Sequence, residues 1–221
     1  MVYFVADASC YWSNVQRRFL DCAVDDPLAA LPYADAAAVE LRAPEKEHVY
    51  SLGHGYPVEL PEAAYKAQWL AQAREHELPD IASIRGEIIV SERFKALAER
   101  LEPGAHQFIL IDISRGPSEQ PYARYYGLNV CNRIDSTDAS AMEREGWYWR
   151  PDYAGGRSHW RKRGEGPRLP IVFNRKQIAA RHLWVDTYLA PYSNFFASNA
   201  FVDATRSEGL TGLLLTQHQE V

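Results

Sequence analysis

The chain repeats one short pattern, Ile89-Val90-Ser91-Glu92-Arg93-Phe94 and then Phe196-Ala197-Ser198-Asn199-Ala200-Phe201. In each copy an apolar pair leads into a serine, and a phenylalanine follows three residues later. A serine at the start of a helix accepts a hydrogen bond from an N–H of the first turn that has no other backbone partner. The phenylalanine then begins the apolar stripe that a helix turns toward a core. Each stretch therefore predicts the end of a strand and the start of a helix, with Ser91 and Ser198 as caps.

Both predicted helices end at residues that stop a helix, and both lead into an apolar strand. This arrangement predicts an internal strand-helix-strand repeat, although two unrelated capped helices would give the same local pattern. The helices are predicted over residues 92–101 and 199–208, their stops at Pro103-Gly104 and Gly209, and the following strands over residues 107–113 and 211–216.

The rest of the chain mixes strand and helix patterns, which indicates an α+β fold with mixed or antiparallel sheets packed with a few helices. We expect an N-terminal region over residues 1–80 and an α+β region over residues 81–221; one continuous domain is the alternative. Further strands are predicted over residues 1–6, 37–41, 81–90, 122–131, 169–173 and 182–187, and further helices over residues 13–23 and 60–77.

Composition favours a folded protein of the cytoplasm. Hydrophobic residues make up 47% and charged residues 24% of 221, and the apolar runs are far shorter than a membrane span. The stretch Met1–Cys10 lacks the basic segment of a signal peptide. The three cysteines, Cys10, Cys22 and Cys131, have no CxxC spacing, so we expect reduced thiols. The net charge of −5 makes nucleic acid an improbable partner.

The sequence offers no recognised catalytic or cofactor motif. His48 and His54 lie near Glu45, Glu47 and Glu59, but their spacing fits no standard zinc site. Neither a nucleophile elbow nor a phosphate-binding loop occurs, so we expect a protein without catalytic residues, metal or cofactor.

An aromatic and basic segment is the main candidate surface for a partner. Its residue types are those of protein interfaces, yet they also suit stacking on nucleic-acid bases or plain burial in a core. The candidate contacts are Trp147, Trp149, Tyr153, Trp160, Arg161 and Arg163. Acidic residues at Asp21, Asp25 and Asp26 could meet a basic partner, or they are solvated loop ends.

Four stretches, residues 89–95, 125–130, 198–201 and 208–213, resemble the immunity protein 11 family of bacterial polymorphic toxin systems. The resemblance lies in the C-terminal part of the chain and leaves residues 1–80 unmatched. It implies an immunity protein that binds and neutralises a cognate toxin, a nuclease being one candidate, in a stoichiometric complex. The alternatives are an enzyme of unknown type with its site in residues 135–170, or a nucleic-acid binder that uses residues 147–168.

Overall fold

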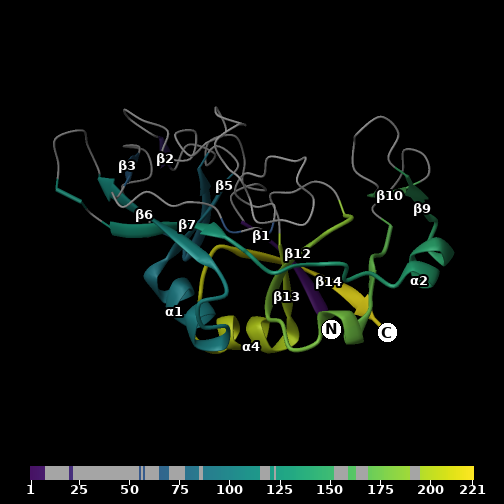
Figure 1. The fold of residues 1–221 in the computed structure, drawn as a ribbon. Coiled ribbons are helices and arrows are strands. Elements are labelled where there is room, and N and C mark those ends of the chain that lie inside the picture. The colour runs from purple at the N-terminus through teal and green to yellow at the C-terminus, as the bar shows by residue number, and fades with distance from the viewer. Residues whose placement is uncertain are drawn as a thin grey trace.

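The computed structural model confirms the α+β class (Figure 1). The strands that it describes form two six-stranded sheets and a separate two-stranded hairpin. Within the described ranges, no helix is long and apolar enough to cross a membrane. The structure describes residues 1–7, 20–21, 55, 57, 65–69, 78–84, 87–114, 120–121, 123–151, 159–162, 169–189 and 195–221.

The first sheet contains the first copy of the repeat. Across this sheet the strands are β2 (Leu20–Asp21), β3 (Tyr65–Trp69), β6 (Gln107–Ser114), β7 (Ala123–Asn129), β5 (Glu87–Ser91) and β4 (Ile81–Ile84), and its helix is α1 (Glu92–Leu101). The hairpin of β4 and β5 leads into α1, which returns to β6. Strand β7 then lies between β5 and β6, antiparallel to both, and β3 runs parallel to β6 on its other side.

The second sheet contains the second copy. Across this sheet the strands are β11 (Val172–Phe173), β14 (Leu213–Glu220), β1 (Val2–Asp7), β13 (Phe195–Ser198), β12 (Leu183–Asp186) and β8 (Arg133–Ile134), and its helix is α4 (Asn199–Ser207). Strands β12 and β13 lead into α4 and then into β14. Strand β1 lies between β13 and β14, antiparallel to both, and β11 runs parallel to β14.

The two copies share more than the predicted strand-helix-strand unit. Five strands match in order and direction: β3, β6, β7, β5 and β4 in the first sheet, and β11, β14, β1, β13 and β12 in the second. The copies differ in where the middle strand comes from, since β7 follows its unit along the chain whereas β1 precedes its unit by almost the whole sequence. The second copy is therefore a permuted version of the first.

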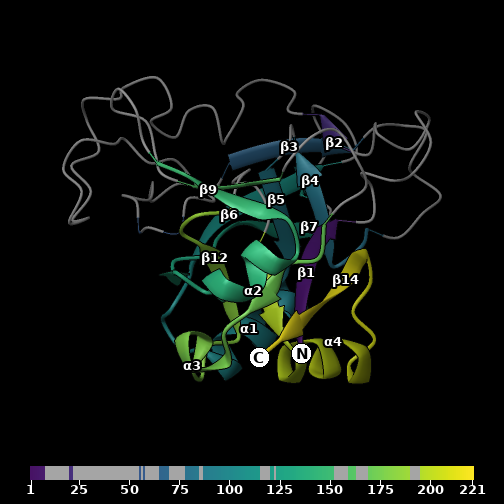
Figure 2. The ribbon, with the colours of Figure 1, turned by 90° about the vertical axis from the view of Figure 1, so that its right-hand side faces the viewer.

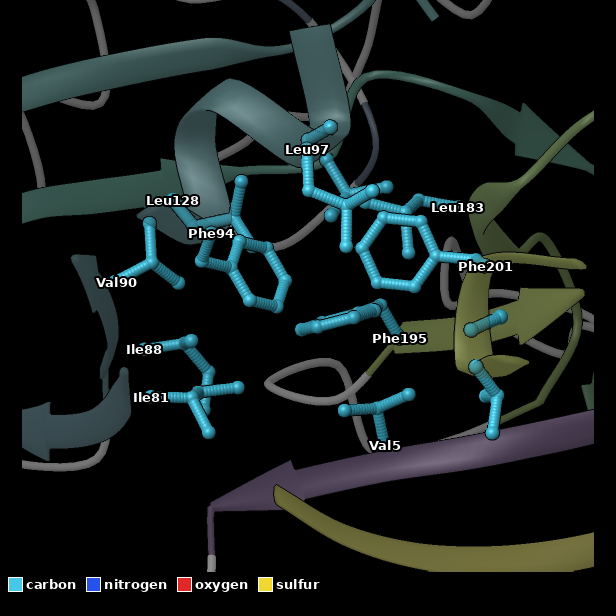
Figure 3. Packing of buried hydrophobic residues seen from close by; sticks show 14 of the residues in the cluster. Val5, Ile81, Ile88, Val90, Phe94, Leu97, Leu128, Leu183, Phe195 and Phe201 are labelled. Atoms are coloured by element: carbon cyan, nitrogen blue, oxygen red, sulfur yellow. The ribbon is translucent and has the colours of Figure 1, made fainter. Parts of the chain in front are cut away.

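Both caps form as predicted, and the copies meet in one apolar core. Ser91 Oγ accepts from Phe94 N and Ser198 Oγ from Phe201 N, each at 3.2 Å. Helices α1 and α4 lie next to each other below the sheets in Figure 1. The rings of Phe94 and Phe201, both fully buried, are 5.5 Å apart between centroids, and Phe195 packs beside them (Figure 3).

The helix predicted over residues 60–77 is wrong at residues 65–69, and the rest of that stretch lies outside the described residues. Residues 65–69 form β3, which pairs with β6 from Tyr65 opposite Ile111 to Gln68 opposite Ser114. The alanine-rich composition favours a helix, but Tyr65, Ala67 and Trp69 alternate with polar residues, as strand residues do. Pairing with a buried strand overrides the local helix preference.

Two other predictions change. The single strand expected over residues 81–90 is a pair, β4 and β5, joined in antiparallel register. In the stretch 13–23, expected as a helix, residues 20–21 form strand β2 against β3, and the remaining residues lie outside the described part of the chain. The strand predicted over residues 37–41 also lies outside it.

Candidate partner-binding hairpin

The strands described in the aromatic and basic segment form a hairpin on the second copy, and a short helix precedes them. Asp138 caps the short helix α2 (Ala139–Arg144), since its Oδ1 accepts from Ala141 N at 2.9 Å. Strand β9 (Trp147–Arg150) then pairs antiparallel with β10 (His159–Lys162). The hairpin lies beside α2 at the edge of the molecule, on the side opposite α1 (Figure 1).

One face of the hairpin is attached to the body of the protein. Trp149 and Trp160 are opposite each other in the register and so share this face, with Trp147 two residues from Trp149. Trp160 is 6% exposed, and its Nε1 donates to Thr137 Oγ1 at 3.0 Å. Trp147 Nε1 donates to the Pro170 carbonyl at 2.8 Å. These indole bonds fix the position of the hairpin.

Trp149 lies on this face and is 39% exposed, and among the described residues the other exposed large apolar side chains are those of Met1 and Val221. Its ring meets Trp160 edge-on at 5.3 Å and Tyr188 at 4.9 Å between centroids. The same Tyr188 accepts a backbone hydrogen bond from Trp160 N at 2.9 Å. Trp149 is thus a rigidly supported aromatic side chain that still faces solvent.

The other face is polar and basic. Strand alternation and the pairs His159 with Arg150 and Arg161 with Tyr148 place these four side chains together. Arg150 and Arg161 are exposed, whereas Tyr148 and His159 are half-buried. Arg161 Nε donates to His159 Nε2 at 3.1 Å, so this imidazole nitrogen carries no proton. We call these four residues the outer face of the hairpin.

A buried carboxylate holds the two segments beneath the hairpin. Asp186, 2% exposed, accepts from Ser136 N at 2.8 Å and from Tyr188 N at 2.7 Å. Ser136 precedes Thr137, the partner of Trp160, and the ring of Tyr188 supports Trp149. Burial raises the pKa of the Asp186 carboxyl, and the hydrogen bonds from Ser136, Tyr188 and Leu189 oppose that rise. Burial and the nearby Asp186 charge also raise the pKa of Asp135.

A cysteine, a histidine and a glutamate also meet in the fold, but not in a geometry that makes a nucleophile. His106 Nδ1 accepts from the Cys131 backbone N–H at 3.3 Å, so its Nε2 holds the proton and donates to Glu102 Oε2 at 3.0 Å. The Cys131 thiol instead donates to the Asn129 carbonyl at 3.4 Å, and burial raises its pKa to about 11. A protonated thiol beside an occupied imidazole nitrogen is a structural group rather than an attacking one.

The model of the immunity protein family Imm11 matches residues 32–220 of the chain. This chain belongs to the Imm11 family. The match confirms the resemblance seen in the sequence and reaches well into the region before residue 80, while among curated proteins none matches significantly. Membership in Imm11 indicates a toxin-neutralising role and a toxin as the partner. The division of the chain at residue 80 stays a prediction.

In this Imm11 protein the predicted contact residues are not all alike. Trp147, Trp149 and Trp160 share the attached face, where only Trp149 is strongly exposed, and Arg161 is on the outer face. The remaining predicted contacts, Tyr153, Arg163, Asp25 and Asp26, lie outside the described residues, and of Asp21 the structure describes only its place in β2. The set stays a prediction as a contact surface.

Sequence reasoning missed the residues that support the hairpin, which are Thr137, Asp186 and Tyr188. Tyr188 follows Trp160 by 28 residues and Thr137 precedes it by 23, and no local spacing connects either of them with this tryptophan. The one available signal was Asp186 directly after the apolar run Leu183-Trp184-Val185, because an acid that continues a buried strand usually has hydrogen-bond partners.

Proposed function

We propose that this chain neutralises one cognate toxin by forming a stoichiometric complex in the cytoplasm, with the β9–β10 hairpin and Trp149 in the contact. The observation that carries the proposal is the Imm11 match over residues 32–220. The protein acts by occupying a surface of the toxin, without catalysis or a cofactor.

The hairpin has the properties of a protein-binding element. Tryptophan and arginine are the residue types that most often dominate binding energy at interfaces. Trp149 is held by Trp160 and Tyr188 before any partner arrives. A side chain that is already ordered loses little conformational entropy on binding, so more of its contact energy stabilises the complex.

The acidic residues Asp21, Asp25 and Asp26 are a second proposed contact, suited to a basic toxin surface such as that of a nuclease. The total charge of −5 favours attraction to such a partner. A complex of this kind should bury at least about 1,000 Å² in total.

The test is to express the toxin domain encoded next to this gene, alone and together with the protein. We expect growth to be rescued and the two chains to co-purify at equal stoichiometry. Trp149→Ala should weaken the complex about 30-fold, as loss of an interface hot spot does. The matched control is Lys176→Ala, at an exposed position on α3 (Arg175–Ile178).

The outcomes separate the function from the surface. Absence of both rescue and co-purification by the unmodified protein would refute the immunity function. Rescue by Trp149→Ala at undiminished affinity would leave the function standing and place the contact elsewhere on the molecule. Thermal unfolding of each variant shows whether the substitution has disturbed the fold.

A further inference from the structure

We infer that the outer face of the β9–β10 hairpin, with Arg150 and Arg161, binds an acidic patch on the partner protein, carboxylate to guanidinium. This inference rests on the proposed function and specifies the chemistry of the partner. It concerns the face of the hairpin that does not carry Trp149.

The first observation concerns the acidic partners of these two cations. Among the described residues, neither Arg150 nor Arg161 takes part in an ion pair, although acidic residues outnumber basic ones 29 to 24 in the chain. Five other described arginines have acidic partners, namely Arg93 with Asp80, Arg100 with Glu208, Arg124 with Asp112, Arg175 with Glu220 and Arg206 with Asp203. Within the described part of the chain Arg144 and Arg181 also form no ion pair, but the outer face holds two such cations side by side on one hairpin.

The second observation is that Arg161 is oriented. Its Nε is bound to His159 Nε2 at 3.1 Å, which leaves the N–H groups of its two terminal nitrogens for a partner. Those groups form the planar pair of donors that matches the two oxygens of a carboxylate. Arg150 lies opposite His159 in the strand register, so both guanidinium groups emerge from one small area.

The third observation is the rigid attachment of the strands. The opposite face is fixed by the bonds of Trp160 to Thr137 and of Trp147 to Pro170. A charged surface on a fixed hairpin keeps its spacing, and charge complementarity then speeds association and selects the partner. The same hairpin thus presents an aromatic rim and a basic face to one protein.

An acidic protein surface fits these observations better than nucleic acid does. Binding to a phosphate backbone needs a track of several cations, whereas the outer face has two. The total charge of −5 would also repel a nucleic acid, which is a long polyanion. An acidic patch on a protein is small, and it attracts the two arginines only over the short distance at which charges are not screened.

The experiment compares two double variants with the same change in total charge. Arg150→Glu with Arg161→Glu reverses the outer face, and Arg144→Glu with Lys176→Glu reverses exposed cations on α2 and α3. The dissociation constant with the purified neighbouring toxin domain is measured by calorimetry at low and high salt, and circular dichroism checks the fold of each variant.

We expect the outer-face variant to bind about 30-fold more weakly at low salt, because like charges then face each other. The loss should shrink at high salt, where exposed charges are screened. The control variant should stay within about 3-fold of the unmodified protein, because Arg144 and Lys176 are not part of the outer face.

Three results would overturn the inference, and they are distinguishable. If the unmodified protein forms no complex, the proposed function fails and the inference with it. If the complex forms but the outer-face variant binds as the control does, only the inference fails. If the outer-face variant loses binding to a single-stranded DNA oligonucleotide but keeps its affinity for the toxin, the face serves nucleic acid instead.

Discussion

The two copies of the repeat have the same strand order but use their capping serines differently. Ser91 Oγ donates to Asp80 Oδ1 at 2.6 Å, and Asp80, only 5% exposed, also accepts from Thr211 N at 2.9 Å. Ser198 Oγ instead meets His182 Nδ1 at 2.9 Å. The first serine therefore joins its helix to the second copy, whereas the second serine stays within its own. The bond from the serine oxygen to the helix N–H is the same in both copies, whereas the second hydrogen bond of each serine has a different partner.

The copies also differ in what the far side of the sheet supports. Behind the second sheet, Phe173, Trp184 and Phe196 form a separate aromatic core that includes Trp160 of the hairpin. The chain ends lie together on this side, where the Met1 ammonium group pairs with Glu220 at 2.7 Å (Figure 2). The β9–β10 hairpin, which is the proposed binding element, thus packs against the second copy. The first copy stabilises the second copy through the core that they share.

The largest effect should come from the contact between the two helices. Phe94→Ala and Phe201→Ala each remove a fully buried ring, which costs about 3–5 kcal/mol of unfolding free energy. The double variant should lose less than the sum, since the rings touch each other. Denaturant unfolding monitored by circular dichroism measures this. Two separate transitions in Phe201→Ala would show that the copies fold independently, contrary to a common core.

The next largest effect should come from Gly212, where the backbones of the two copies approach each other closely. Gly212 has φ +82°, and a Cβ there would lie 2.3 Å from the Ile81 carbonyl oxygen. Gly212→Ala should cost about 2–4 kcal/mol, from left-handed strain plus displacement of strand β4. The control is Gly209→Ala, where φ is +64° with open space around it, at about 1 kcal/mol. Equal melting temperatures for both variants would contradict this close approach.

A carboxylate that bridges the copies predicts a pH dependence. Glu102, just after α1, accepts from Leu183 N of β12 at 2.8 Å and from His106. Burial raises the pKa of Glu102, but these hydrogen bonds outweigh it and the net pKa lies below 4.5. A lowered folded-state pKa means stability that is present above about pH 4.5 and is lost as pH falls through the folded value.

Glu102→Gln should therefore cost about 1–3 kcal/mol at pH 7 and little at low pH, because the unmodified protein loses that advantage on acidification. The measurement is unfolding free energy across pH 3 to 7, with the exposed Glu143→Gln as the control. A constant difference between Glu102→Gln and the unmodified protein over this range would rule out the assigned role.

The smallest effect compares the caps themselves. Ser91→Ala and Ser198→Ala should each cost about 0.5–2 kcal/mol, with Ser91 the larger because Asp80 also loses a donor. Combining Ser91→Ala with Asp80→Asn should be non-additive, unlike Ser198→Ala with Asp80→Asn. Thermal unfolding checks the order, with the exposed Ser207→Ala as reference. A larger loss at Ser198 would reverse the comparison.

Prediction from sequence worked where the signal was local. The cap at Ser91, the helix bounds of α1 and the buried Phe94 follow from side-chain chemistry within one turn. The candidate hairpin could be found by its composition, but its two faces could not be told apart, because that depends on the pairing of Trp149 with Trp160. The helix predicted over residues 60–77 shows the opposite case. Residues 65–69 form strand β3 because they pair with the parallel strand β6, in spite of the helix preference of the local sequence.

The sequence by itself determined the α+β class, the two capped helices and the Imm11 resemblance, because capping, apolar periodicity and short motifs act within a few residues. The tertiary structure alone decided that β1 completes the second copy, that Asp186 supports the hairpin and that Arg161 lies on the opposite face from Trp149. These features depend on strand register and on contacts between residues distant along the chain, and neither is encoded in any short stretch of sequence.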